Sequence, residues 1–289
     1  MTTTTPSQPL TLAVAQFAMS DTPETNLARA IELVRAAHAR GAQVVLLPEL
    51  FATPYFPREI DPKFFALAHA VDDDPSLHAL APLARELSVV LPVSFFERAG
   101  DAYFNSLAVL DADGRSLGLY RKTHIPDGSG YEEKYYFKPG DTGFRRYVTR
   151  YGNLGVGICW DQWFPESARA MTLLGADLLL YPTAIGSEPV TNRDTSAPWR
   201  RAMIGHAVSN TIPLGAANRV GREGDQIFYG TSFIADPWGE VVAELGRTEE
   251  GVCIATLDLA AARSDRDWMG LVRDRRPETY GVLTREPQR

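Results

Sequence analysis

The sequence predicts a layered α/β fold with mixed sheets, and three observations support this prediction. Apolar runs typical of buried strands alternate with segments of helical periodicity. Several later strands are separated only by short turns, such as Asp113-Gly114 and the DPWG sequence at 236–239, which indicates antiparallel hairpins. There is no low-complexity linker, change of composition or solenoid repeat that would divide the chain. We therefore expect one layered domain, preceded by a disordered tail over residues 1–9.

The N-terminal half contains these elements in order. "TLAVAQFAM" predicts a buried strand, and the sequence Asp21-Thr22-Pro23-Glu24 predicts a capped helix start with an early proline. Gly41 ends that helix, and "AQVVLLPEL" is a second buried strand. A helix around 75–88 leads to the strand "VVLPVSFFE". The segments "YFNSLAVLDADG" and "SLGLYRKTH" then form a hairpin.

The C-terminal half begins with a long loop over 125–143 that is rich in glycine, proline and aromatic residues. Loops of this length in compact domains are usually functional or disordered, and the aromatic content argues against disorder. The remaining predicted elements are a strand ending in "GVGICW", a helix at about 165–174, the strand "ADLLLYPTA", a helix at about 198–209, and strands in "TIPLGAANRV", "IFYGTSFIADPWGEVVAEL" and "GVCIATLDL".

Composition excludes several classes of partner. The chain has 289 residues and a net charge of −7, without the clusters of lysine and arginine that bind nucleic acid or an anionic membrane. It has no apolar run of about 18 residues, as a membrane-spanning helix requires, and no basic region opens the sequence as in a secretory signal. Its two cysteines do not form a disulfide framework, so we expect a cytoplasmic protein.

Three residues at the ends of predicted apolar strands could carry chemistry. Cys159 lies at a strand–turn–helix junction, where helix N-terminal amides can lower the pKa of a thiol. The alternative is that Cys159 is a small core residue, which is our interpretation of Cys253 in its mid-strand position. Glu49 follows a buried strand, where an unpaired carboxylate is costly, although it could instead face solvent. Lys122 ends the strand before the long loop and could likewise be an exposed lysine.

Together, these three residues form a chemically consistent set. The carboxyl ends of strands are where open α/β sheets build their sites. The carboxylate of Glu49 could accept the thiol proton of Cys159, and the ammonium of Lys122 could stabilise a thiolate and an oxyanion. His124 is the histidine closest to this set in sequence, and it could line the pocket. No HExxH, CxxC or His/Asp cluster supports a metal site, so we expect neither a metal nor a cofactor.

Four long segments carry a resemblance to a known family: "LLPELFATPYF", "YRKTHIPDGSGYEEKYYFKPGD", "GVGICWDQWFPESARAM" and "YPTAIGSEP". They resemble the nitrilase (carbon–nitrogen hydrolase) superfamily, and most closely its N-carbamoylputrescine amidohydrolase branch. The resemblance implies a four-layer αββα sandwich, with residues 10–289 as a single carbon–nitrogen hydrolase domain. It also implies a catalytic triad of Glu49, Lys122 and Cys159. A further acid that assists catalysis in the family corresponds to Glu133, with Glu132 as the neighbouring alternative.

The resemblance also implies a reaction. We expect hydrolysis of N-carbamoylputrescine to putrescine, ammonia and carbon dioxide, a step of polyamine biosynthesis, through a covalent thioester. The substrate is a small cation, for which Glu188 is the candidate partner because a buried charge needs an opposite one. The backbone N–H of Trp160 would help to hold the oxyanion, and Tyr55, Tyr131 and Trp160 could line an apolar tunnel. The family's subunits pair through sandwich faces, so we expect a homo-oligomer built from dimers.

Other functions remain open from the sequence. N-carbamoyl-D-amino acids are a competing substrate class, but the paired arginines typical of those enzymes are missing from residues 161–164, although Arg193, Arg200 and Arg201 follow later in the chain. An amidase acting on ω-amides is a second alternative. A catalytically silent assembly module is a remote one, since such a protein would have no reason to keep the thiol, both acids and the lysine.

Overall fold

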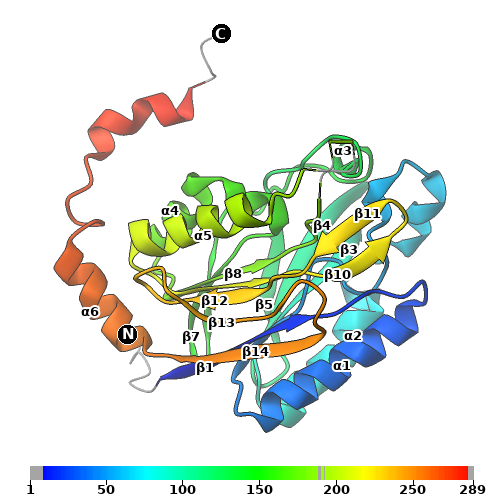
Figure 1. Cartoon of the computed structure of the whole chain (residues 1–289), viewed down its shortest axis with the longest axis horizontal. Helices are drawn as coiled ribbons and strands as arrows, with labels where there is room; N and C mark the ends of the chain where they lie inside the picture. The colour runs from blue at the N-terminus through cyan, green and yellow to red at the C-terminus, as the bar shows by residue number, and fades with distance from the viewer. Residues whose placement is uncertain (1–8, 188–189, 192, 286–289) are drawn as a thin grey trace.

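The computed structural model describes residues 9–187, 190–191 and 193–285. Apart from Pro9, the predicted tail lies outside these residues. Two β-sheets stack face to face, with helices α1 and α2 covering one outer face and α4 and α5 covering the other (Figure 1). This is the four-layer αββα sandwich that the resemblance implies.

Each sheet contains six strands. In the first, β14 (Gly251–Leu257), β1 (Leu10–Gln16) and β2 (Val44–Leu46) continue through a bridge between Val44 and Val90 into β3 (Leu91–Ala99), β4 (Ala102–Leu110) and β5 (Ser116–Arg121). The second has the order β13 (Val241–Glu244), β12 (Phe233–Ala235), β9 (Leu214–Ala217), β8 (Leu178–Pro182), β7 (Gly152–Val156) and β6 (Arg146–Thr149). β7, β8 and β9 are parallel and their outer neighbours are antiparallel, so the sheets are mixed, as predicted.

A separate hairpin of β10 (Val220–Glu223) and β11 (Gln226–Tyr229) lies beside the sandwich. The α-helices are α1 (Pro23–Ala39), α2 (Pro75–Leu87), α3 (Glu133–Tyr136), α4 (Pro165–Leu173), α5 (Ser196–Asn210) and α6 (Leu259–Met269). Short 3₁₀ helices are η1 (Phe56–Arg58), η2 (Pro62–Leu67), η3 (Val71–Asp73), η4 (Cys159–Trp163) and η5 (Pro277–Thr284).

The layers follow from the two-residue period of the strands. Along β1, Leu12 and Val14 point into the core between the two sheets, while Ala13 and Ala15 point toward α1 and α2. Small residues on the outer face let the helices approach closely, and each large aliphatic side chain in the central core contributes about 1.5–3 kcal/mol by leaving water. Cys253 lies in this central core, so its interpretation as a core residue is confirmed.

Some predicted elements differ from those observed. The side chain of Thr22 does not cap α1, although the proline does occupy the first turn. The long loop contains the short helix α3. The segment "TIPLGAANRV" is not one strand, because β9 ends at Ala217 and β10 starts at Val220. Helix α6 was not predicted, although Asp258 caps it by accepting from two backbone N–H groups.

Candidate active site

Four chain segments bring the predicted residues to one place. Glu49 follows β2, Lys122 follows β5, and Cys159 opens η4, which is separated from β7 by Gly157 and Ile158. The fourth residue, Glu133, is the first residue of α3 in the long loop. All four side chains are buried. Glu49, Lys122 and Cys159 come after strands, and each of these strands ends where its apolar run ends. Polar side chains therefore gather at the carboxyl edge of both sheets.

Lys122 is the centre of the cluster. Its Nζ donates to Oε1 of Glu49 at 2.8 Å and to Oε1 and Oε2 of Glu133 at 2.8 and 2.7 Å. Lys122, Glu49 and Glu133 have no exposed side-chain surface. Of the two adjacent acids, Glu133 makes the contact with Lys122. The backbone N–H of Glu132 donates to the carbonyl oxygen of Pro57. One ammonium therefore lies between two buried carboxylates.

Cys159 sits beside this cluster at a sharp turn. Its φ of +43° lies in the left-handed region, which is uncommon for a residue with a side chain. Its Sγ lies 3.8 Å from the carbonyl oxygen of Ala184, and the backbone N–H of Glu49 donates to the adjacent Thr183 at 3.3 Å. The nucleophile candidate and the base candidate are thus both anchored at the end of β8.

The pKa of the Cys159 thiol is set mainly by its burial. Burial raises the pKa of Cys159 well above its ordinary value, and the carboxylates of Glu49 and Glu133 add to this effect, while Lys122 opposes it. Lys122 does lower the pKa of this thiol, but its effect is smaller than that of burial. Desolvation outweighs the nearby ammonium, so the thiol is protonated at neutral pH.

Lys122 and Glu133 also have shifted pKa values. Burial by itself would lower the pKa of Lys122, but the carboxylates of Glu133 and Glu49 raise it above its ordinary value. Burial raises the pKa of Glu133 to about 7, with Lys122 opposing this shift and Glu49 adding to it. The lysine is thus fixed in its charged form, and the Glu133 carboxyl is poised to exchange a proton near neutrality.

The aromatic residues predicted to line a tunnel contact the same cluster. The hydroxyl of Tyr55 donates to Oε1 of Glu133 at 2.5 Å, and the ring of Tyr131 packs edge-on against Tyr55 with centroids 5.9 Å apart. The hydroxyl of Tyr131 accepts from the N–H of Gly186 and from the side chain of Gln226. Tyr55 therefore helps to hold Glu133 in place.

His124 and Trp160 lie on the Cys159 side of the site. The imidazole Nδ1 of His124 lies 2.7 Å from Oδ1 of Asp161, and its ring stacks on Phe164 with centroids 3.6 Å apart. Trp160 is 38% exposed and contacts Trp163 edge-on. Glu188 lies outside the described residues.

Several polar residues that support the site were missed by the sequence reasoning. Asn105 in β4 donates to Oε1 of Glu49 at 2.6 Å. Asp161 accepts from the backbone N–H groups of Ile158 and His124, and Arg219 donates to the backbone of Glu49. Asn105 had a detectable signal, since a lone amide interrupts a buried strand. Asp161 and Arg219 gave none, because their partners are distant in sequence or are backbone atoms.

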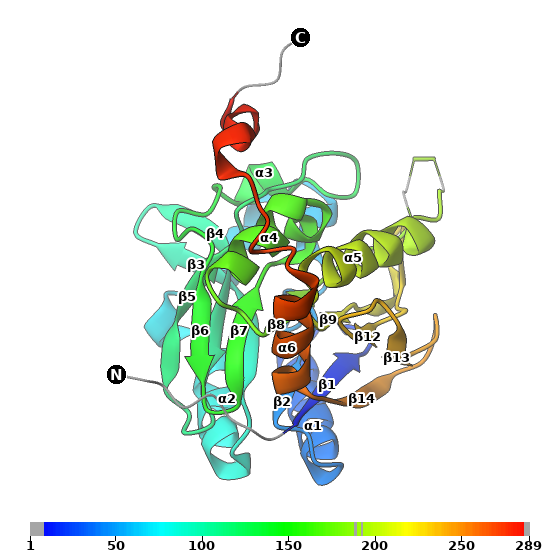
Figure 2. The same cartoon turned by 90° about the vertical axis from the view of Figure 1, so that its left-hand side faces the viewer.

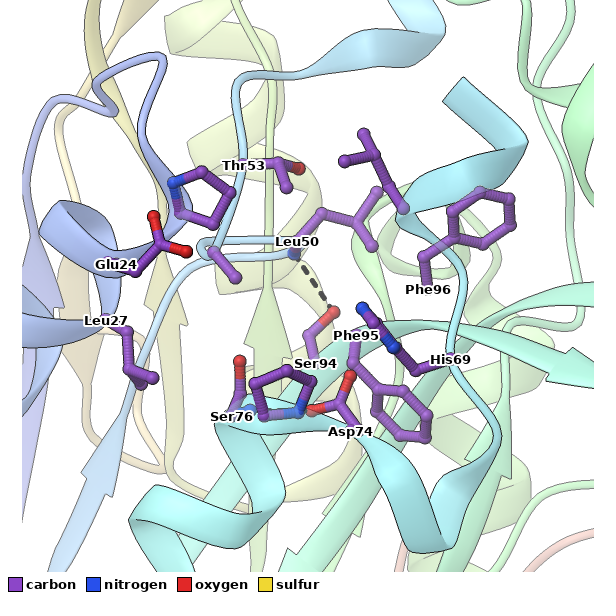
Figure 3. Close-up of a pocket in the computed structure, with 14 residues that line it drawn as sticks. Glu24, Leu27, Leu50, Thr53, His69, Asp74, Ser76, Ser94, Phe95 and Phe96 are labelled. Carbon is purple, nitrogen blue, oxygen red and sulfur yellow. Dashed lines mark hydrogen bonds between the residues drawn. The ribbon is translucent and has the colours of Figure 1, made fainter. Parts of the chain in front are cut away.

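A cavity of about 260 Å³ lies behind the segment that follows Glu49. The residues lining it include Leu50, Thr53, His69, Asp74 and Ser94, but none of the predicted catalytic residues (Figure 3). The Oγ of Ser94 accepts from the N–H of Leu50 at 3.0 Å and so supports the turn from this side.

The described part of the chain offers neither a metal site nor a membrane-spanning helix. Residues 9–187, 190–191 and 193–285 contain no group of three or more histidine, cysteine, aspartate or glutamate residues arranged to hold a metal ion. Within the same ranges, none of the helices has the length and apolar character needed to span a bilayer.

Comparison with known proteins identifies the family. The model of the carbon-nitrogen hydrolase family matches residues 11–267. The chain belongs to this family. It is therefore an enzyme that hydrolyses carbon–nitrogen bonds of amides. A carbon–nitrogen hydrolase structure from Helicobacter pylori aligns with a TM-score of 0.92 at 36% identity and covers 97% of this chain and 100% of that one.

Two similar proteins carry names that state their substrates. An N-carbamoylputrescine amidase of Solanum lycopersicum is 53% identical, covering 95% of this chain and 94% of the relative. A citrullinase of Francisella tularensis is 46% identical, covering 95% and 98%. Both names denote hydrolysis of a compound with a terminal carbamoyl group.

Proposed function

We propose that this carbon–nitrogen hydrolase converts N-carbamoylputrescine to putrescine, ammonia and carbon dioxide, with Cys159 as the nucleophile. The observation that carries the proposal is that the two carboxylate oxygens of Glu49 differ in their hydrogen bonding. Its Oε1 is occupied by Lys122 and Asn105, while its Oε2 is buried and has no hydrogen-bond partner among the described residues. A buried carboxylate oxygen beside a protonated thiol is suited to accept that proton.

In the first half of the reaction, Glu49 takes the proton of Cys159 as the sulfur attacks the carbamoyl carbon. Lys122 and the backbone N–H of Trp160 stabilise the negative oxygen of the tetrahedral intermediate. The intermediate collapses when the bond to the terminal nitrogen breaks. Glu49 returns its proton to that nitrogen, so ammonia leaves and an N-alkylcarbamoyl thioester remains on the sulfur.

In the second half, water attacks the thioester carbonyl. Glu49 or Glu133 removes the proton of the water, and the raised pKa of Glu133 suits it to proton exchange near neutral pH. The C–S bond breaks, the thiol of Cys159 is regenerated, and the N-carboxy product loses carbon dioxide to give the free diamine.

Substrate preference would come from the far end of the pocket. The distal ammonium of a carbamoyl diamine needs an acidic partner, and we propose Glu188 for this role on its sequence position. Tyr55, Tyr131 and Trp160 would contact the methylene chain, and His124 would line the entrance. The half-exposed Trp160 and the edge-packed tyrosines support this arrangement.

Citrulline hydrolysis is the second candidate, because the Francisella citrullinase is 46% identical. Citrulline carries the same ureido group, but its far end bears a carboxylate as well as an ammonium. Arg193 lies close to Glu188 in sequence and could meet that carboxylate. Ammonia release from the purified protein should be compared with N-carbamoylputrescine, citrulline and an ω-amide as substrates.

The expected result is a kcat/KM for N-carbamoylputrescine at least about tenfold above the other two substrates. Cys159→Ala should abolish ammonia release, and Glu188→Gln should reduce the preference for the cationic substrate. A Cys159→Ala protein that releases ammonia at the parent rate would refute the proposed mechanism. If Glu188→Gln left the preference for the cationic substrate unchanged, only the substrate assignment would be refuted.

We propose that residues 10–289 form one domain and that the enzyme works in the cytoplasm. We also propose that it is a homo-oligomer built from dimers. Half-exposed Leu173, Leu174 and Val208 on the α4–α5 face and exposed Val282 and Leu283 in the C-terminal segment support pairing. The C-terminal segment extends away from the body (Figure 2). Val282→Asp combined with Leu283→Asp should lower the mass measured by light scattering.

A further inference from the structure

A buried ion pair that the mechanism does not use lies directly behind the site. Arg219 is fully buried between β9 and β10, and its Nη1 donates to Oε1 of Glu223 at 2.8 Å. The guanidinium also lies over the rings of Tyr55 and Phe228 at 5.6 and 5.3 Å. Burying two charges is costly, so a pair in this position calls for a reason beyond stability.

Arg219 holds the turn that carries Glu49. Its Nη2 donates to the carbonyl oxygens of Glu49 at 2.7 Å and Leu50 at 3.1 Å, and its Nη1 lies 3.3 Å from the carbonyl oxygen of Thr53. Leu50 has a φ of +47°, which is strained for a branched side chain. Such a conformation persists only where the surroundings enforce it, and here Arg219 and Ser94 do so from opposite sides.

Glu223 holds the other end of the same segment. Its Oε2 accepts from the backbone N–H of Tyr55, and the hydroxyl of Tyr55 in turn donates to Glu133. The ion pair therefore binds the backbone of residues 49–55 at both ends. One end carries Glu49, and the other carries Tyr55, which binds Glu133. Both carboxylates that flank Lys122 are thus connected to the ion pair.

We propose that Arg219 and Glu223 form a positioning unit that aims the Glu49 carboxylate at Cys159 and orients Glu133 through Tyr55. The proposal rests on the proposed base role of Glu49 but not on the identity of the substrate. Neither residue touches the reacting atoms. They act by fixing the strained backbone turn on which the free oxygen of Glu49 depends.

The test uses Arg219→Lys, which keeps the positive charge beside Glu223 but removes the planar fork that reaches three carbonyl groups. The matched control is Arg266→Lys. Arg266 also binds a backbone carbonyl, that of Ala176, and a buried carboxylate, that of Asp177. These two residues precede β8, whereas the site lies after the other end of that strand. Arg266 is partly buried, whereas Arg219 is fully buried. A purely structural effect of shortening an arginine that binds a carbonyl group and a carboxylate should appear in both variants.

The decisive readout is alkylation of Cys159 by iodoacetamide across pH, followed site by site with mass spectrometry. It needs no substrate and reports proton transfer from the thiol to Glu49. We expect Arg219→Lys to slow alkylation at pH 7.5 about tenfold and to lower kcat about 100-fold with a small change in KM, because a displacement near 1 Å suffices for such losses. Arg266→Lys should keep both values.

Ser94→Ala provides a second variant in case Arg219→Lys does not fold. It removes the other support of Leu50 and leaves the ion pair intact, so alkylation should slow in the same direction. If the folded Arg219→Lys protein shows the parent's alkylation profile and kcat, the positioning role is wrong. If alkylation responds as expected while the parent releases no ammonia from N-carbamoylputrescine, the positioning role stands and the substrate assignment fails.

Discussion

Asp161→Asn tests whether the turn at Cys159 depends on one buried carboxylate. Asp161 accepts four hydrogen bonds: Oδ1 from the N–H and Nδ1 of His124, and Oδ2 from the N–H of Ile158 at 2.9 Å and the hydroxyl of Tyr120 at 2.7 Å. Asparagine has nearly the same shape but only one acceptor oxygen. One of the two acceptor positions must therefore become an N–H₂ group that faces donors.

The cost can be worked out from these partners. If the amide oxygen stays with His124, the hydroxyl of Tyr120 can rotate and accept from the new N–H₂, but the N–H of Ile158 loses its partner. A buried unsatisfied N–H costs about 1–3 kcal/mol, and the loss of charge from the remaining bonds adds about 1 kcal/mol. We expect a loss of about 2–4 kcal/mol in the free energy of unfolding, or about 3–7 °C in Tm for a chain of 289 residues.

The assay combines thermal unfolding by circular dichroism with kcat. Because Ile158 immediately precedes Cys159, Asp161→Asn should also lower kcat about 100-fold. Asp177→Asn is the matched control: Asp177 is a buried carboxylate bound by Asn153 and Arg263 far from the site, so it should lower Tm but keep kcat. An Asp161→Asn protein with parental Tm and kcat would refute the reasoning.

Three further predictions concern separate features. Tyr55→Phe removes a donor that lowers the pKa of Glu133, so the acid limb of the pH–rate profile should move up by about one pH unit; a profile that does not move would contradict this. Gly140→Ala would place a Cβ 2.8 Å from the carbonyl oxygen of Lys122 and closer still to that of Arg121, so turnover assays should show nearly complete loss of activity in soluble protein. Cys253→Ser should keep kcat within about twofold while lowering Tm by a few degrees, because it buries a hydroxyl in the core.

The sequence itself pointed to three of the four central residues because their signal is local. Glu49, Lys122 and Cys159 each follow an apolar run, and a polar residue at that point lies at the carboxyl edge of a sheet whatever the strand order. The family resemblance added Glu133 and the sandwich. The pairing of strands across the two sheets did not follow from periodicity, since a buried strand has the same pattern in either sheet.

The supporting residues could not be predicted for a different physical reason. Arg219 binds carbonyl groups 166 to 170 positions away, and any residue type supplies a carbonyl, so its partners leave no trace in the sequence. The split of the predicted strand at Asn218 and Arg219 has the same origin. The backbone breaks there because both side chains turn inward to bind main-chain groups, Asn218 binding both the N–H and the carbonyl oxygen of Ile185.

The state of the resting thiol decides how the site must work. Burial raises the pKa of Cys159 more strongly than Lys122 lowers it, so the resting site holds a neutral thiol. The ammonium is already shared by two carboxylates and cannot by itself maintain a thiolate. In the proposed mechanism, proton transfer to Glu49 would then accompany the attack by Cys159, which would make the rate sensitive to the position of one carboxylate oxygen. This explains why strained turns occur at Cys159 and directly after Glu49, and why buried polar groups hold both.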